Sequence, residues 1–135
     1  ARPATRTPAA RIGRGIVSPL LFLAAALAGG LGAVLRYLVD HGVARFAGRG
    51  FPWGIVLVNI TGSFALGLVT TALPDAAFIL GAGLLGGYTT FSTAMLDTVA
   101  LWRDGERPAS AFHAIGMLLL GLTAAGLGLA LGALV

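Results

Sequence analysis

The chain has 135 residues, 57% of them hydrophobic and only 10% charged, with a net charge of +4, 21 glycines and no cysteine. A soluble domain of this length would need far more charge to cover its surface, and without cysteine neither disulfides nor thiolate metal sites can form. The basic residues are all arginines, scattered mostly over termini and loops as in membrane proteins, so we expect no nucleic-acid partner.

Four stretches of the sequence are long and apolar enough to cross a bilayer, which takes about 20 consecutive residues. They cover residues 15–35, 51–74, 76–96 and 108–135, and none contains Asp, Glu, Lys or Arg. We expect four transmembrane helices over about 18–39, 53–73, 76–101 and 109–131. The connections leave no room for a soluble domain, so residues 16–135 are predicted to form one all-α integral membrane domain in the lipid bilayer.

The first 15 residues form a basic segment, in which proline, alanine and threonine separate Arg2, Arg6, Arg11 and Arg14. We expect this segment, 1–15, to be a disordered lead-in. A cleaved signal peptide is the alternative for this segment together with the first apolar run. That run continues past the usual length of a signal-peptide core and ends at Arg36, which favours a retained helix.

The arginines are divided almost evenly between the two sides of the membrane. With four spans, the N-terminus, the second loop and the C-terminus share one side, which has the four arginines of the lead-in. The other side has four as well, or five if Arg36 is included: Arg45, Arg49, Arg103 and Arg107. Cytoplasmic loops normally carry a clear excess of Lys and Arg that sets the orientation. The near balance indicates that the chain can insert in either orientation.

The first two predicted helices carry small residues at helical spacing, which allows close helix packing. In the first, the stripe comprises Ala25, Gly29, Gly32, Ala33 and Arg36, and in the second it comprises Asn59, Gly62, Ser63, Gly67 and Thr70. Arg36 either snorkels to the headgroups or faces a water-filled vestibule. Asn59 either links two helices or serves as an amide donor to a passing anion, and the pattern alone leaves both readings open.

The third predicted helix is interrupted by Gly-Gly-Tyr-Thr-Thr-Phe-Ser-Thr over residues 86–93, which combines two glycines with four Ser and Thr hydroxyls. Backbone groups freed at membrane depth are tolerated only inside protein or along a hydrated cavity. Freed carbonyls can coordinate a cation, while hydroxyls and helix N-termini can meet an anion. The alternative is a kink in which the hydroxyls bond back to the preceding turn. Four hydroxyls beside a glycine pair favour an ion site.

The fourth predicted helix has another packing stripe, formed by Gly121, Ala125, Gly128 and Gly132. Met117 and His113 lie one and two turns before it on the same face. A histidine inside a membrane is a functional candidate. His113 lies near the end of its span. A histidine that is hydrogen-bonded within the protein, or that faces the membrane interface, is therefore an equally good interpretation.

Three of these segments resemble the motifs of one known family, the CrcB/Fluc fluoride channels. Residues 29–37 resemble the first-helix motif, residues 59–64 with Gly67 the second-helix motif, and residues 86–93 the third-helix signature. The similarity covers all four spans in order, and the third motif is the most specific. It implies a fluoride-specific ion channel in the bacterial cytoplasmic membrane, which exports fluoride passively and lowers its cytoplasmic concentration.

The resemblance also implies an antiparallel, dual-topology dimer with two narrow anion pores and a structural Na⁺ at its centre. The Na⁺ would be held by backbone carbonyls of Gly86 and Thr89. The fluoride pore would be lined by Asn59, Phe91 and a hydroxyl track of Thr90, Ser92 and Thr93. Arg36 matches the vestibule arginine of the family, and Asp97 stands where the family usually has Glu.

Four positions depart from the family pattern, all of them at pore-lining sites. Ala94 replaces a second pore phenylalanine, His113 and Met117 replace Tyr and Ser, and Ile55 replaces a common Thr. A homodimer of this chain would therefore lack the second phenylalanine in both pores. The competing hypothesis is a heterodimer with a paralogous subunit, in which only one of the two pores conducts.

Two other classes of membrane protein were weighed against a channel. A small multidrug transporter, also a four-helix dual-topology dimer, relies on a carboxylate within its first helix, and here the first carboxylate is Asp40 at the far end. A non-transporting assembly protein would have no need of a hydroxyl-rich interruption. The sequence offers no carboxylate pair, histidine cluster or nucleophile–base arrangement at membrane depth, so we expect no enzyme.

Overall fold

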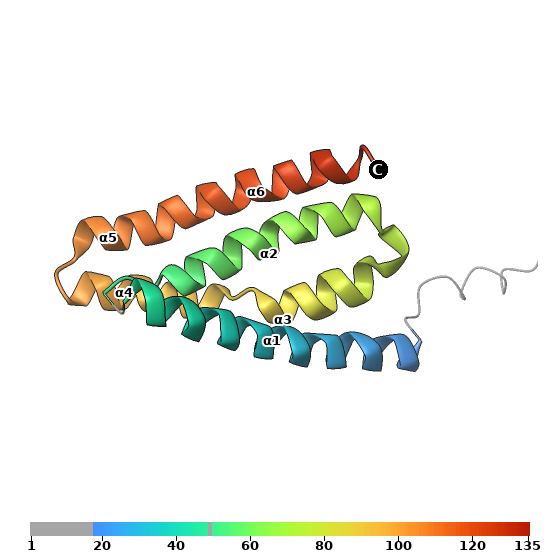
Figure 1. Cartoon of the computed structure of the whole chain (residues 1–135), viewed down its shortest axis with the longest axis horizontal. Helices are drawn as coiled ribbons and strands as arrows, with labels where there is room; N and C mark the ends of the chain where they lie inside the picture. The colour runs from blue at the N-terminus through green and yellow to red at the C-terminus, as the bar shows by residue number, and fades with distance from the viewer. Residues whose placement is uncertain (1–17, 49) are drawn as a thin grey trace, which may run out of the picture.

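The computed structural model describes residues 18–48 and 50–135, and the chain is helical through most of these ranges. The elements are α1 (Pro19–Ala47), α2 (Trp53–Ala72), η2 (Pro74–Ala76), η3 (Phe78–Leu85), α3 (Gly86–Tyr88), α4 (Phe91–Arg103), α5 (Arg107–Ala111), η4 (Phe112–Gly116) and α6 (Met117–Gly132). They form four spans long and apolar enough to cross a membrane, Pro19–Ala47, Trp53–Ala72, Phe78–Arg103 and Arg107–Gly132 (Figure 1). The predicted all-α fold of four transmembrane helices is confirmed, whereas the predicted lead-in, 1–15, lies outside the described residues.

The first helix is longer than the sequence predicted. Ser18 caps it by accepting a hydrogen bond from the Leu21 N–H at 3.1 Å, and Pro19 occupies the first turn, where its missing N–H has no helical partner. The prediction ended the helix at residue 39. The helix itself continues through polar residues to Ala47 and ends at Gly48, whose φ of 78° favours glycine.

Glycines let α1 lie directly against the first half of the third span. A Cβ atom on Gly32 would collide with the backbone carbonyl of Leu84, and one on Gly87 would collide with that of Gly29. Any larger side chain at these positions would push the two helices apart. The small-residue stripe of the first helix is therefore a packing face, as the spacing predicted.

The second and fourth spans make the other close pair, with α2 lying along α6 (Figure 1). A Cβ atom on Gly67 would collide with the carbonyl of Ala125, and one on Gly128 with the carbonyl of Phe64. Both glycines belong to the predicted stripes of their helices. Backbones in such contact gain van der Waals attraction over a long interface, which is how helices associate without a hydrophobic driving force.

The third span is broken, as predicted, and the break lies at Thr89 and Thr90. Both residues are extended, with φ −77° and ψ 160° for Thr89 and φ −150° and ψ 124° for Thr90. The glycine pair that suggested the break is still helical in α3, and Gly87 makes the contact with α1 instead. The chain leaves the helix at two β-branched residues, which tolerate extended backbone well.

The outer surface of the bundle is apolar, as a lipid environment requires. Side chains such as Leu27 on α1 and Leu122 on α6 are more than half exposed, at 68% and 63% of their surface. The start of α1 and the end of α6 lie at the same end of the bundle (Figure 1), as four spans demand. The chain is thus a multi-pass membrane protein.

Candidate functional site

The break in the third span is held open by Asn59 of α2. Its side-chain Nδ2 donates to the Thr90 carbonyl at 2.8 Å, and its Oδ1 accepts from the Thr90 N–H at 2.8 Å. The amide thus meets both backbone groups of one extended residue, as a neighbouring strand would. Asn59 therefore serves as a link between helices, the first of its two predicted roles.

The second hydrogen on Asn59 Nδ2 faces a thioether. Nδ2 lies 3.4 Å from Met117 Sδ of α6. A thioether is a weak acceptor, so this contact fills the remaining donor position of the amide without binding it strongly. The second predicted role of Asn59 is to donate to an anion. Met117 occupies the hydrogen that this role requires.

Three hydroxyls of the predicted track lie within reach of one another at the break. Thr90 Oγ1 donates to Thr93 Oγ1 at 3.0 Å and accepts from the Thr93 N–H at 3.3 Å, which caps α4. Thr90 Oγ1 and Ser92 Oγ are 3.4 Å apart. Thr90 is buried whereas Ser92 is exposed, so the track runs from the interior of the chain to its surface.

Phe91 lies on the other side of this segment from the buried residues. Its side chain is 77% exposed, whereas Ala94, almost one turn later, is completely buried. The structure therefore separates the predicted pore residues into two groups. Asn59, Thr90 and Thr93 lie together inside the chain, while Phe91 and Ser92 project outward.

The break also frees backbone carbonyls. In a continuous helix the Thr90 N–H would bond to the Gly86 carbonyl, but here it donates to Asn59. Thr89 is extended, so its carbonyl lies outside the helical ladder as well. In the described part of the chain no three His, Cys, Asp or Glu side chains converge on a possible metal. Backbone oxygens are ligands that hard cations accept, and the carbonyls of Gly86 and Thr89 are the predicted pair.

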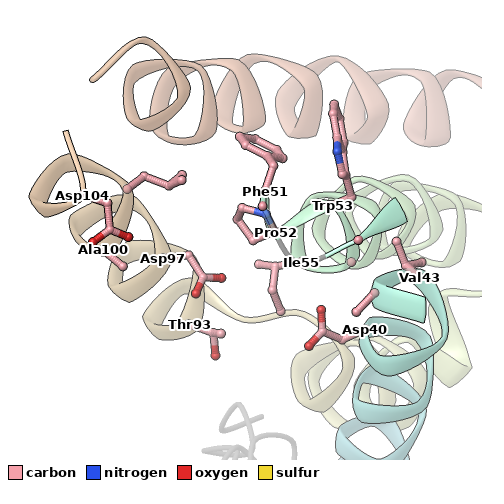
Figure 2. Close-up of a pocket in the computed structure, with 15 residues that line it drawn as sticks. Asp40, Val43, Phe51, Pro52, Trp53, Ile55, Thr93, Asp97, Ala100 and Asp104 are labelled. Carbon is pink, nitrogen blue, oxygen red and sulfur yellow. The ribbon is translucent and has the colours of Figure 1, made fainter. Parts of the chain in front are cut away.

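A cavity of about 310 Å³ lies at the end of the bundle beyond the break. Three carboxylates line it: Asp97 belongs to α4, Asp104 directly follows that helix, and Asp40 faces them from α1 (Figure 2). Gly54 at the start of α2 allows Asp40 to approach, because a Cβ atom there would collide with the Asp40 carboxylate. Thr93 and Ile55 form part of the same lining. We call this cavity the acidic cavity.

A second cavity, of about 370 Å³, lies on the other side of the break and is called the groove. It runs between α2, the first half of the third span and α6. Its lining includes Asn59, Thr89, Thr90, Phe91 and Met117, with apolar residues over most of the remaining wall. The groove therefore brings Asn59, Thr90 and Phe91 to one cavity, whereas Thr93 lines the acidic cavity and Ser92 lines neither.

The remaining two candidates, His113 and Arg36, stand apart from both cavities. His113 is completely buried; its Nδ1 lies 2.9 Å from Thr98 Oγ1, which itself donates to the Ala94 carbonyl at 2.8 Å. Among the described residues its Nε2 has no hydrogen-bond partner. Arg36 is partly exposed on α1 and lines neither cavity. Neither side chain meets Asn59 or the hydroxyl track.

The sequence reasoning missed the acidic cavity. Asp97 had been noticed only as a family position, and Asp104 not at all. The signal was present in part, since Asp97 and Asp104 are seven residues apart and so share one face of a helix. Asp40 comes from a different span, and only the packing of Gly54 against α1 brings it to the same cavity.

Comparison with known proteins places this arrangement in context. Residues 23–129 match the protein family described as CrcB-like protein, Camphor Resistance (CrcB). The chain is 47% identical over 124 residues to "Fluoride-specific ion channel FluC 1" of Leifsonia xyli subsp. xyli, which covers 87% of this chain and 90% of the relative. It is also 47% identical over 110 residues to "Fluoride-specific ion channel FluC 2" of Mycobacterium tuberculosis, covering 80% and 87%. A relative from Nitrobacter winogradskyi, "Fluoride-specific ion channel FluC", is 45% identical over 109 residues, covering 76% and 86%.

Proposed function

Because this chain belongs to the CrcB-like family, we propose that it is a subunit of a fluoride channel in the bacterial plasma membrane. Fluoride leaves the cell passively, driven by its gradient and the membrane potential. The relatives named above as fluoride-specific channels support this activity. The observation that carries it in the structure is the Asn59–Thr90 pairing, which holds a hydroxyl-bearing segment extended inside the third span.

A small anion crosses a membrane only where donors replace its water. The hydroxyls of Thr90, Ser92 and Thr93 are such donors, and they require no fixed positive charge that would trap the ion. The first turn of α4 begins at the same place, and the N–H groups at a helix start favour an anion. Phe91 adds a ring whose edge is the positive part of its quadrupole. These groups support passage of an anion in preference to a cation.

The pore is completed in a dimer of two chains in opposite orientations. The near balance of arginines supports insertion in both orientations. The outward projection of Phe91 and Ser92 supports a second chain as the other wall of the pore, because Phe91 is 77% exposed among the described residues. The second chain is either another copy or a paralogue, and the numbered names FluC 1 and FluC 2 among the relatives support the existence of paralogues.

A structural Na⁺ at the centre of this dimer is the cofactor we propose. Gly86 and Thr89 would supply two carbonyl oxygens from each chain, and their loss of helical partners fits this use. Oxygen donors suit a small hard cation. The ion would tie the two broken helices together, while the fluoride donors remain on the other side of the same segment.

The experiment is anion efflux from liposomes that contain the full chain. We expect the wild-type chain to release fluoride and retain chloride, and Phe91→Ile to reduce fluoride efflux about tenfold because the ring edge is lost. Phe22→Ile on the lipid side of α1 is the matched control, since Phe22 is 66% exposed but lies far from the break in sequence. Equal fluoride and chloride rates, or no fluoride efflux above protein-free liposomes from folded protein, would contradict a fluoride channel.

A further inference from the structure

Three apolar side chains from three different spans meet in the interior of the chain. Ile55 of α2, Ala94 of α4 and Met117 of α6 form one buried cluster, with exposed fractions of 4%, 0% and 9%. Met95 packs against the cluster from outside. We call these three residues the apolar plug.

The plug lies between the two cavities. Ile55 lines the acidic cavity and Met117 lines the groove. The hydroxyl track crosses at the same place, because Thr93 lines the acidic cavity and Thr90 lines the groove. An ion that moved between the cavities on the inner side of the break would have to pass the plug.

Two of the donors beside the plug, the Thr90 hydroxyl and the Asn59 amide, are already engaged. The Thr90 hydroxyl donates to Thr93, and one hydrogen of the Asn59 amide donates to the Thr90 carbonyl. The other hydrogen faces Met117 Sδ at 3.4 Å. Ile55 and Ala94 have no polar side-chain atoms. A partly dehydrated anion would therefore exchange its water for an apolar surface, which is strongly unfavourable.

We propose that Met117 limits fluoride passage along the inner path of this chain, by closing the path and by covering the free N–H of Asn59. This inference rests on the proposed function. In this proposal the thioether of Met117 controls conductance on the side of the break where Asn59 and Thr93 lie.

The test compares two methionine substitutions in the full chain, reconstituted in liposomes and assayed for fluoride and chloride efflux. Met117→Ser removes the thioether and places a hydroxyl beside Asn59. Met95→Ser is the matched control, because Met95 is the only other methionine and touches the plug without reaching Asn59. We expect Met117→Ser to raise the fluoride rate about tenfold, which converts to about 1.4 kcal/mol, while Met95→Ser stays within about twofold and chloride stays retained.

A second variant guards against loss of folding in the first. Ile55→Thr keeps the branch at Cβ, is shorter than isoleucine, and adds a hydroxyl on the acidic side of the plug, so it should also raise the fluoride rate. Fluoride-selective efflux by the wild type that neither variant increases, with both variants eluting as the wild-type species, would overturn the role of Met117 and leave the channel function standing. An equal increase in Met95→Ser would overturn it as well, since general loosening of the core would then explain the effect. Absence of fluoride efflux from the wild type and from all variants would instead contradict the channel function.

Discussion

Asn59 and Thr90 are joined by two hydrogen bonds of 2.8 Å, from the amide nitrogen to the Thr90 carbonyl and from the Thr90 N–H to the amide oxygen. The two residues are 31 positions apart and belong to different spans. One side chain therefore satisfies both backbone groups of Thr90, which the break leaves without helical partners. It links the stability of the fold directly to the geometry of the ion path.

Removal of this side chain should destabilise the chain. Asn59→Ala leaves the N–H and carbonyl of Thr90 without partners, and we expect a loss of about 1–3 kcal/mol in unfolding free energy. Asn59→Asp is the informative comparison, because its carboxylate still accepts from the Thr90 N–H but cannot donate to the carbonyl. Reversible unfolding in mixed detergent micelles measures both. An alanine variant as stable as the wild type would show that the pairing contributes little.

The contact between α2 and α6 gives a matched pair of glycine substitutions within one helix. A Cβ atom on Gly128 meets the Phe64 backbone, whereas one on Gly126 meets no atom within 4 Å. We expect Gly128→Ala to cost about 1–3 kcal/mol through forced separation of the helices. Gly126→Ala should be neutral or stabilising by up to about 1 kcal/mol, since alanine is the better helix former. Thermal unfolding in detergent distinguishes the two, and equal effects would rule out the close contact.

The acidic cavity should slow the approach of fluoride. Asp97→Asn removes one of the three carboxylates that line it. In water, the repulsion between two unit charges roughly 8 Å apart is about 0.5 kcal/mol. We expect the fluoride efflux rate to rise about twofold at low ionic strength and the gain to shrink in high salt. Asp75→Asn, at an exposed loop outside both cavities, is the control. A lower rate in Asp97→Asn would mean that the carboxylate assists conduction.

Dual topology can be tested with single cysteines, because the natural chain has none. Asp75→Cys and Glu106→Cys place thiols in exposed loops at opposite ends of the bundle. In intact spheroplasts, an impermeant maleimide should label about half of the molecules in each variant if the chain inserts both ways. Full labelling of one variant and protection of the other would establish a single orientation.

Removal of Na⁺ should weaken the assembled protein. If the carbonyls of Gly86 and Thr89 hold the ion, replacement of NaCl by N-methylglucamine chloride lowers the stability of the dimer. The loss reaches about 2.7 kcal/mol where Na⁺ had been present at about 100 times its dissociation constant. Potassium chloride at equal ionic strength is the control for screening, because the larger cation fits four carbonyls less well. Identical unfolding curves in all three salts would exclude a structural Na⁺.

The sequence by itself determined the features that depend on neighbouring residues. Hydropathy over a few turns defined the four spans, helical spacing identified the glycine stripes, and the local density of hydroxyls indicated a broken third helix. The 86–93 segment was specific enough to indicate the family. These features are local, since the periodicity of a helix and the length of an apolar run are fixed by the order of the residues.

Only the tertiary structure decided which residues meet. The glycine pair had suggested the position of the break, yet the break lies at Thr89 and Thr90 because Asn59 pairs with the backbone there. The contact between Asn59 and Met117 joins residues 58 positions apart, and the gathering of Ile55, Ala94 and Met117 depends on three spans. Such contacts follow from how helices approach one another through their glycines, and the order of residues along the chain does not record that approach.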